Sequence, residues 1–201
     1  MSRLLAVAIT GGIGAGKSTA LDAFRRHGAA TVSSDEIVHH LLRTDPEVKH
    51  ALVERFGDEI LDPDGVPDRE RIGFRVFNDR DALDWLEKLL HPLVSREYLE
   101  WREQLAALPS PPAVCVTEVP LLYEVGGESR FDKVVVITAP RKLRKARRGG
   151  QQDDRESRLL PEREKVERGD FVYVNTGTPD ELDAWVASVM AALTGEDAVG
   201  S

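Results

Sequence analysis

The chain reads Gly11-Gly12-Ile13-Gly14-Ala15-Gly16-Lys17-Ser18 near its start. These eight residues fit the pattern G-x-x-x-x-G-K-[ST], in which glycines let backbone N–H groups turn inward around phosphate oxygens. An apolar run at residues 4–9 precedes the pattern, and a helical pattern over residues 18–26 follows it. A strand, a glycine-rich loop and a helix in this order are typical of a phosphate-binding loop, to which the positive end of the helix dipole contributes.

The chemistry of such a loop assigns a role to each residue type. Backbone N–H groups of the loop surround the phosphates, Lys17 is expected to reach the β- and γ-phosphates, and the Ser18 hydroxyl is expected to bind Mg²⁺. The alternative is a glycine-rich turn before a helix that binds nothing.

Five short apolar runs indicate the fold class. They lie at residues 4–9, 29–32, 113–116, 133–137 and 171–174, and helical patterns separate them. Continuous rather than alternating apolar runs are typical of strands buried on both faces of a parallel sheet. We therefore predict an α/β fold with a doubly wound, five-stranded parallel sheet.

The composition limits the class of protein. The chain has 201 residues, of which 41% are hydrophobic and 31% charged, with a formal net charge of −8. We predict a single domain over residues 1–201 in the cytoplasm, without nucleic-acid partners, because phosphate-backbone binding favours a basic face. No apolar run is long enough for a membrane span, and the single cysteine, Cys115, lies in an apolar run that favours a buried thiol.

About 80 residues between the second and third strands are mostly helical in pattern, so residues 33–108 are predicted to form a helical insertion. Helix signals begin with Ser33, which forms a capping box with Glu36, and with Asp45-Pro46, whose helix ends near Gly57. A further helical pattern runs from about residue 68 to 108, and we expect a break at Pro92.

An ordered set of motifs now resembles the dephospho-coenzyme A kinase family over nearly the whole chain. The motifs comprise the loop through Thr19, Ser34-Asp35-Glu36-Ile37, Phe56-Gly57, Asp64-Gly65-x-x-Asp68-Arg69, Val76-Phe77, Leu86-Glu87-x-x-Leu90-His91-Pro92, Glu118-Val119-Pro120-Leu121-Leu122-Tyr123-Glu124, and Asn175-Thr176-Gly177. The His-Pro and Val-Pro-Leu-Leu-x-Glu segments are more specific than the loop, which many ATPases and GTPases share.

The resemblance implies a P-loop kinase that transfers the γ-phosphoryl group of ATP to the 3′-hydroxyl of dephospho-coenzyme A. It implies ATP and Mg²⁺ as cofactors, dephospho-coenzyme A as the small-molecule partner, and a monomer or weak homo-oligomer. The implied nucleotide-binding residues are Gly12, Ile13, Gly14, Ala15, Gly16, Lys17, Ser18, Thr19, Asn175 and Gly177. The implied acceptor-binding residues are Asp35, Arg69, His91, Pro120 and Leu121, with Ser18 at the metal.

The chain departs from the family pattern in two places. The family has Asp-Ala-Asp after the second strand, where this chain has Ser33-Ser34-Asp35. The arginine-bearing lid, which we place at residues 140–165, is several residues shorter than the family's, and its arginine and glutamine pattern is blurred. We therefore expect Asp35 to act without the first aspartate of the family pattern, which Ser33 replaces here.

Asp35 and the basic run over residues 141–148 are the catalytic candidates beside Lys17. A carboxylate at the end of the second strand could align the acceptor hydroxyl and take its proton, and the alternative is a residue that only stabilises a helix N-terminus. Arg144 and Arg147 are the lid arginines we expect to neutralise charge on the transferred phosphoryl group, and the alternative is a solvated helix face.

The remaining candidates each keep a structural alternative. His91 precedes a proline, which predicts an extended or helix-ending backbone, and it either lines the acceptor site or caps a helix. Arg69 either pairs with an acceptor phosphate or forms an intrahelical ion pair. Glu118 either binds magnesium-bound water or makes a structural pair, and Asn175 and Gly177 form either an adenine pocket or a simple turn.

Rival functions predict other residues. A kinase for nucleoside monophosphates or other small hydroxyl acceptors is the nearest alternative. A P-loop regulatory switch is the alternative from another class, but the Asn-Lys-x-Asp motif of GTP switches is absent from the sequence.

Overall fold

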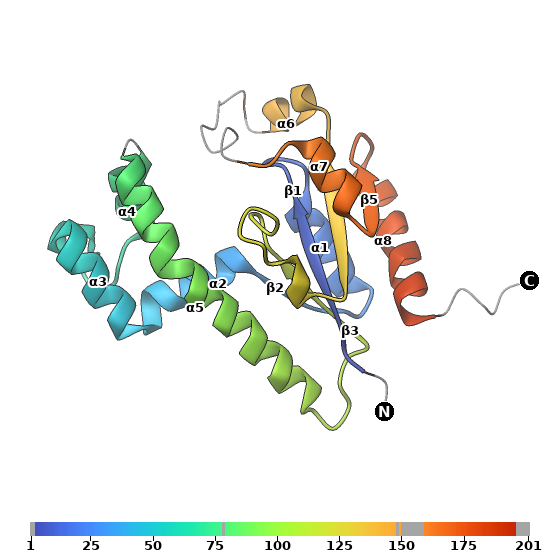
Figure 1. The fold of residues 1–201 in the computed structure, drawn as a ribbon, viewed down its shortest axis with the longest axis horizontal. Coiled ribbons are helices and arrows are strands. Elements are labelled where there is room, and N and C mark those ends of the chain that lie inside the picture. Colours follow the sequence, from blue (N-terminus) through green and yellow to red (C-terminus); the bar gives the residue numbers. More distant parts are fainter. Residues whose placement is uncertain (1–2, 78, 148, 150–158, 196–201) are drawn as a thin grey trace, which may run out of the picture. The chain divides into compact units, whose positions relative to one another are not determined.

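The computed structural model describes residues 3–77, 79–147, 149 and 159–195. These residues fall into two compact units (Figure 1). The first takes in the described residues of Met1–Ser33 and Arg102–Ser201, and the second is Ser34–Trp101. The predicted division, one domain with an insertion at residues 33–108, stays a prediction.

The first unit is built on a five-stranded sheet in the order β2-β3-β1-β4-β5, with every neighbouring pair parallel. The strands are β1 (Leu5–Gly11), β2 (Ala30–Ser33), β3 (Val114–Glu118), β4 (Lys133–Thr138) and β5 (Phe171–Val174). The predicted fold class is confirmed. The three central strands are buried along almost their whole length, which explains their continuous apolar runs.

Two helices pack with the alternate side chains of one face of this sheet. Val7, Ile9, Val135 and Ile137 share a core with residues of α1 (Lys17–Arg26) and α8 (Pro179–Thr194). Phe24 of α1 is fully buried in that core. The bounds of α1 confirm the helix predicted over residues 18–26.

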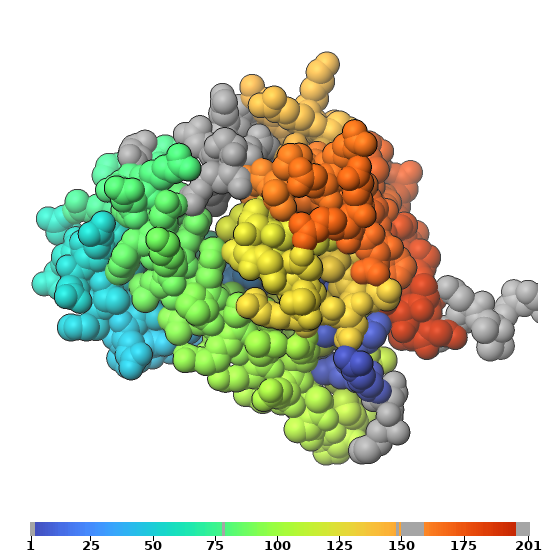
Figure 2. Space-filling model, viewed as in Figure 1, coloured from blue at the N-terminus to red at the C-terminus, as the bar shows by residue number. Residues whose placement is uncertain are grey.

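The side chains at the intervening positions of β1 and β4 point to the other face of the sheet. Ala8, Val134 and Val136 pack with the segment over residues 119–131, which contains the 3-10 helix η2 (Glu128–Arg130), and with α7 (Glu162–Arg168). Figure 2 shows this segment, in yellow, directly beside α7, in orange. Helix α6 (Arg141–Arg147) also belongs to the first unit and follows β4.

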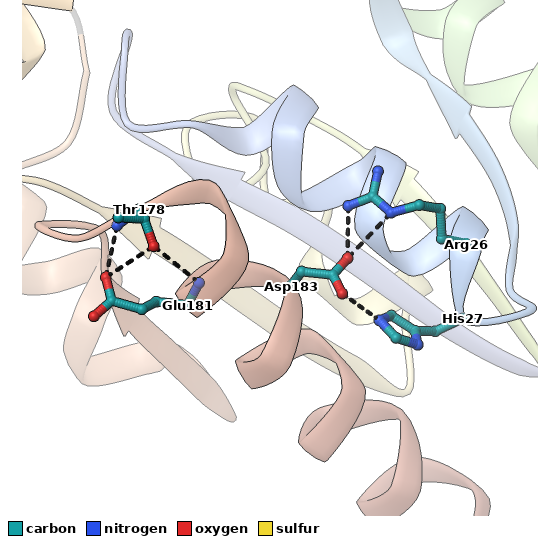
Figure 3. A network of polar contacts seen from close by, with 5 residues as sticks. All are labelled: Arg26, His27, Thr178, Glu181 and Asp183. Carbon is teal, nitrogen blue, oxygen red and sulfur yellow. Dashed lines mark hydrogen bonds and ion pairs between the residues drawn. The ribbon is translucent and has the colours of Figure 1, made fainter.

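Helices α1 and α8 are also joined by a polar contact (Figure 3). The Asp183 carboxylate of α8 accepts hydrogen bonds from Arg26 Nε at 3.1 Å and Nη2 at 2.6 Å, and it lies 3.0 Å from His27 Nε2. Figure 3 also shows the start of α8, where the Thr178 and Glu181 side chains cap one another's backbone N–H groups. The contacts fix the C-terminal end of α1 and the N-terminal end of α8.

The second unit is helical and has its own core. It contains α2 (Ser34–Thr44), α3 (Pro46–Phe56), the 3-10 helix η1 (Asp58–Ile60), α4 (Arg69–Phe77) and most of α5 (Arg80–Ala106). The predicted start and end of α3 are confirmed, because Asp45 accepts hydrogen bonds from two N–H groups of its first turn and Gly57 is its C-cap. The buried apolar side chains of the core are Leu42, Val48, Leu52, Ile60, Ile72 and Leu90.

The expected break at Pro92 is wrong. Helix α5 runs from Arg80 to Ala106 with Pro92 inside it, so the extended or helix-ending backbone expected for His91 is wrong as well. Proline removes one backbone donor from a helix and strains the preceding turn. The buried side chains Leu90 and Val94 lie on either side of Pro92, and their burial outweighs that local cost.

The helical pattern instead ends at a place that the sequence analysis did not predict. Helix α4 stops at Phe77 and α5 begins at Arg80. The Asp79 carboxylate accepts a hydrogen bond from the Ala82 N–H at 2.9 Å, which is an N-cap interaction at the start of α5.

The single cysteine lies in the sheet. Cys115 of β3 is 1% exposed, which confirms the prediction of a buried thiol. Burial in the apolar sheet raises the pKa of this thiol from 9.0 to about 11.

The Asp183 contact predicts a pH dependence of stability. Hydrogen bonds from Arg26 and then His27 lower the pKa of Asp183 below 3.8. A carboxyl whose folded-state pKa is lowered stabilises the fold above its unfolded pKa, and that contribution is lost as the pH falls through the folded value. We expect Asp183→Asn to have a lower melting temperature than wild type at pH 7. This difference in melting temperature should narrow below about pH 4, near the unfolded aspartate pKa. Thermal unfolding followed by circular dichroism from pH 7 to pH 3 measures this; a gap that stays constant would contradict it.

Candidate nucleotide-binding site

The phosphate loop occupies the turn between β1 and α1, as its sequence predicts. Gly11 is the last residue of β1 and Lys17 the first of α1. Within the turn, the Gly12 carbonyl accepts hydrogen bonds from the Ala15 N–H and from Lys17 Nζ, both at 3.2 Å. Lys17 is buried, so its ammonium group is held inside the loop.

The loop is closely packed at Gly16. This residue has a φ of 103°, which L side chains rarely adopt, and a Cβ on it would lie 2.3 Å from Asn175 Nδ2. The Asn175 side chain donates to the Ala15 carbonyl at 2.8 Å. Asn175 directly follows β5, so the start of the predicted Asn-Thr-Gly segment meets the loop.

Arg147 joins the same contact from α6. Its guanidinium group donates to the Ala15 carbonyl at 3.3 Å, to the Asn175 backbone carbonyl at 3.1 Å and to the Asn175 side-chain oxygen at 3.3 Å. The Ala15 carbonyl is therefore the point at which the phosphate loop meets the C-terminal end of α6 and the residue after β5.

Arg144 lies at the other end of the loop. A Cβ on Gly12 would lie 2.8 Å from Arg144 Nη1, so the guanidinium group is packed against the Gly12 backbone. Arg144 Nε donates to the Ala139 carbonyl at 3.0 Å, and its Nη2 lies 3.5 Å from a carboxylate oxygen of Glu162 on α7. The same Glu162 carboxylate accepts a hydrogen bond from the Thr138 hydroxyl at the end of β4.

Glu162 is the residue of this site that sequence reasoning missed. It lies in the highly charged run Glu162–Arg168, where nothing in the local pattern separates it from a solvated helix face. Its neighbours Thr138 and Arg144 come from a strand end and another helix, so only the folded chain brings the three together.

Glu118 ends β3 beside the loop. The Ser18 hydroxyl lies 3.4 Å from Glu118 Oε2, and Glu118 is buried. The two residues thus place a hydroxyl and a carboxylate oxygen next to each other at the carboxyl edge of the sheet. Thr19 follows in the first turn of α1 and is exposed.

Pro120 and Leu121 continue from the end of β3. The Thr10 hydroxyl at the end of β1 donates to the Pro120 carbonyl at 3.3 Å, and Leu121 is half-buried. Pro120 is therefore tied to the strand that leads into the phosphate loop. Gly177 has a different place: a Cβ on it would overlap the Glu181 carboxylate, so it belongs to the turn that caps α8.

The other acceptor candidates lie in the helical unit. Asp35 is in the first turn of α2, directly after β2, and its carboxylate accepts a hydrogen bond from Arg69 Nη2 at 3.0 Å. Both side chains are exposed, at 74% and 55%. The ion pair of Arg69 joins α4 to α2, so it is not the intrahelical pair that was the alternative. His91 lies within α5.

The predicted lid at residues 140–165 is described in part. Helix α6 and the residues from 159 onward belong to the described chain, and residues 148 and 150–158 lie outside the described residues. Arg144 and Arg147 point from α6 to the two ends of the phosphate loop, as the contacts with Gly12 and Ala15 show.

Known proteins carry the same sequence pattern and fold. A family model described as dephospho-CoA kinase matches residues 5–181. The chain belongs to the dephospho-CoA kinase family. The dephospho-CoA kinase of Anaeromyxobacter dehalogenans is 38% identical to it over 196 residues, which cover 94% of this chain and 92% of that relative. The dephospho-CoA kinase of Aquifex aeolicus is 34% identical over 194 residues, which cover 94% and 97%.

A solved structure of the dephospho-CoA kinase from Campylobacter jejuni has a similar fold. It matches with a TM-score of 0.67 and 25% identity, over 94% of this chain and 97% of that one. Kinases of the dephospho-CoA kinase family use ATP. Among the described residues of this family member, no helix is long and apolar enough to cross a membrane.

The close packing at Gly16 predicts a selective loss of nucleotide binding. Gly16→Ala and Gly28→Ala both place a side chain at a positive φ, 103° and 92°, and this backbone strain should cost each variant about 1–2 kcal/mol of folding free energy. Only at Gly16 does the new Cβ meet neighbours, because nothing lies within 4 Å of the Gly28 position.

We therefore expect Gly16→Ala to weaken ATP binding at least tenfold and Gly28→Ala to leave it within about twofold of wild type. Urea denaturation measures the stability of each variant, and titration calorimetry measures its ATP affinity. Equal ATP affinities in the two variants would show that packing at Gly16 does not shape the site.

Proposed function

We propose that this chain transfers the γ-phosphoryl group of ATP to the 3′-hydroxyl of dephospho-coenzyme A, giving coenzyme A and ADP. The observation that carries the proposal is the gathering of Arg144, Arg147 and Asn175 on the phosphate loop of a member of the dephospho-CoA kinase family. Lid arginines, a loop lysine and a loop of backbone donors are what phosphoryl transfer requires.

The donor site is assigned to the loop and the residues packed on it. Backbone N–H groups of the loop bind the ATP phosphates, and Lys17 turns from the Gly12 carbonyl to the β- and γ-phosphates. Asn175 holds the loop through Ala15, and Gly177 shapes the turn that follows. The full set of nucleotide-binding residues in this proposal is Gly12, Ile13, Gly14, Ala15, Gly16, Lys17, Ser18, Thr19, Asn175 and Gly177.

Arg144 and Arg147 are assigned to the charge that spreads over the transferred phosphoryl oxygens. Each guanidinium group carries several N–H donors in a planar fork, which suits phosphate oxygens. The Arg144 fork is held by the Ala139 carbonyl and the Glu162 carboxylate, and the Arg147 fork is held by Ala15 and Asn175. The side chains are thus already directed to the loop, and little reorganisation is needed when charge develops.

The oxygen atoms of Ser18 and Glu118 suit Mg²⁺. The ion prefers hard oxygen ligands and is usually held by one or two protein groups together with the substrate phosphates. The described residues contain no group of three or more His, Cys, Asp or Glu side chains that could hold a metal alone, which agrees with such a shared site. Bound Mg²⁺ would neutralise charge on the β- and γ-phosphates.

The acceptor site is assigned to Asp35, Arg69, His91, Pro120 and Leu121. Asp35 accepts the proton of the 3′-hydroxyl while the oxygen bonds to the γ-phosphorus, and the bond to the β-phosphate oxygen breaks so that its electron pair leaves with ADP. Arg69 already orients the Asp35 carboxylate through their 3.0 Å hydrogen bond. Its second role is to bind an acceptor phosphate.

A cytoplasmic location and a monomeric or weakly oligomeric state stay predictions. Neither is needed for the assignment of the reaction.

A panel of acceptors tests the reaction. We expect Mg²⁺-dependent ADP release to be stimulated by dephospho-coenzyme A far more than by AMP, GMP, cytidine or shikimate. Lys17→Ala should fold normally and lose several orders of magnitude in turnover. A coupled ADP assay measures both. Stronger stimulation by a nucleoside monophosphate would assign the chain to another kinase class, and normal turnover in Lys17→Ala would remove the kinase assignment.

A pair of variants tests the role of Asp35. Asp35→Asn keeps a hydrogen-bonding group but cannot take a proton, so turnover should fall roughly 10²- to 10⁴-fold. ATP affinity and melting temperature should hardly change, because the Asp35–Arg69 pair is exposed and such pairs contribute about 0–1 kcal/mol.

Ser33→Ala is the matched control two residues earlier. Ser33 is buried directly before α2, so its loss should lower stability by about 1 kcal/mol and leave turnover nearly unchanged. Turnover and thermal unfolding of both variants decide the question. Full turnover in Asp35→Asn would mean that Asp35 only stabilises the start of α2.

A further inference from the structure

Helix α7 holds part of the site but is too short to be stable by itself. It has seven residues, and no side chain caps its N-terminus. Isolated helices of this length are unstable in water, so contacts with the rest of the unit must hold α7 in place. Because Glu162 of α7 contacts Thr138 and Arg144, the position of α7 determines where Arg144 is held against the phosphate loop.

A buried ion pair is the strongest candidate for that contact. Lys165 Nζ lies 2.7 Å from Glu124 Oε1, and the two side chains are only 1% and 13% exposed. The same Glu124 oxygen accepts a hydrogen bond from the Leu160 N–H at 2.9 Å, just before α7 begins. Glu124 therefore holds both the chain entering α7 and the middle of the helix.

Glu124 belongs to the segment over residues 118–124, which is one of the motifs that carry the resemblance to the family. The proposed donor and acceptor sites do not include Glu124 itself. Lys165 follows Glu162 by three residues, so the two side chains lie on neighbouring positions of one helix face. A contact at Lys165 therefore acts on Glu162 without an intervening flexible linker.

A second ion pair at the end of α7 provides an internal comparison. Arg168 pairs with Glu128, and its guanidinium carbon lies 4.1 Å from the centre of the Tyr123 ring. The Arg168 and Glu128 side chains are 41% and 32% exposed, so water solvates this pair far more than the first. It lies at the opposite end of α7 from Glu162.

We propose that Glu124 and Lys165 are positioning residues for phosphoryl transfer. They fix α7 so that Glu162 holds the Arg144 guanidinium group against Gly12. The proposal rests on the function proposed above. Breaking a buried pair leaves one charge without a partner, and α7 then shifts to bring that charge to water or to a new partner. A displacement of about 1 Å at a group that stabilises the transition state can reduce turnover about 10²-fold.

The test begins with Lys165→Met, which keeps most of the length of the side chain and removes its charge. We expect kcat per folded site to fall about 10- to 100-fold, with the KM for dephospho-coenzyme A within about twofold of wild type. The concentration of folded sites is taken from the stoichiometry of ATP binding by calorimetry. The control, Arg168→Met, makes the same kind of change at the exposed pair and should leave kcat per folded site unchanged.

A double-mutant cycle separates positioning from stability. If Lys165 acts through Arg144, adding Lys165→Met to Arg144→Ala should cause no further loss of kcat per folded site. An effect of Lys165 on catalysis that does not pass through Arg144 predicts that the two losses multiply, and that result would overturn the proposal. Wild-type kcat per folded site in Lys165→Met alone would overturn it as well.

A charge-free double variant and a measurement of ATP binding complete the test. If Lys165→Met does not fold, Glu124→Gln/Lys165→Met removes both charges and takes its place in the cycle. If the wild-type chain does not phosphorylate dephospho-coenzyme A, the proposed function fails, and the same cycle is measured in the Kd for ATP. We then expect Lys165→Met to weaken ATP binding about tenfold alone and not at all in the Arg144→Ala background, and multiplying losses would overturn the positioning role.

Discussion

The site depends on a steric constraint: the phosphate loop is too closely packed for side chains at Gly11, Gly12 and Gly16. A Cβ on Gly11 would lie 1.9 Å from the Ile137 carbonyl of β4, and one on Gly16 would lie 2.3 Å from Asn175 after β5. The absence of side chains lets the backbone of the loop approach two strand ends that come much later in the chain. That approach brings the residues after β4 and β5, including Arg144, Arg147 and Asn175, to the phosphate-binding turn.

The parts of this arrangement that depend on local sequence could be predicted. Continuous apolar runs identified all five strands, and for the three central ones the reason is that strands buried on both faces need an apolar residue at nearly every position. The loop was predicted from residues 11–18 with the apolar run before it and the helical pattern after it, since its backbone conformation requires glycine at fixed positions. The two ends of α3 were predicted from Asp45, Pro46 and Gly57 for the same reason, because helix ends have strict local requirements.

The parts that depend on contacts between distant residues could not be predicted. The contact of Glu162 with Arg144 and Thr138 requires the end of β4 and two helices to meet, and no spacing in the sequence encodes it. The error at Pro92 has a related cause, because local strain favours a break while the burial of Leu90 and Val94 favours a continuous helix. Local rules describe the cost at one residue, and the packing that outweighs it comes from the rest of the unit.

The burial of Cys115 has a consequence for redox chemistry. Dephospho-coenzyme A and coenzyme A both carry a thiol, and oxidised forms of such thiols exchange with protein thiolates. The thiolate is the reactive species, and a thiol with a pKa of about 11 is almost entirely protonated at neutral pH. The chain has no other cysteine. Cys115 is therefore poorly placed, by both its burial and its protonation, to exchange with the thiol of such a substrate.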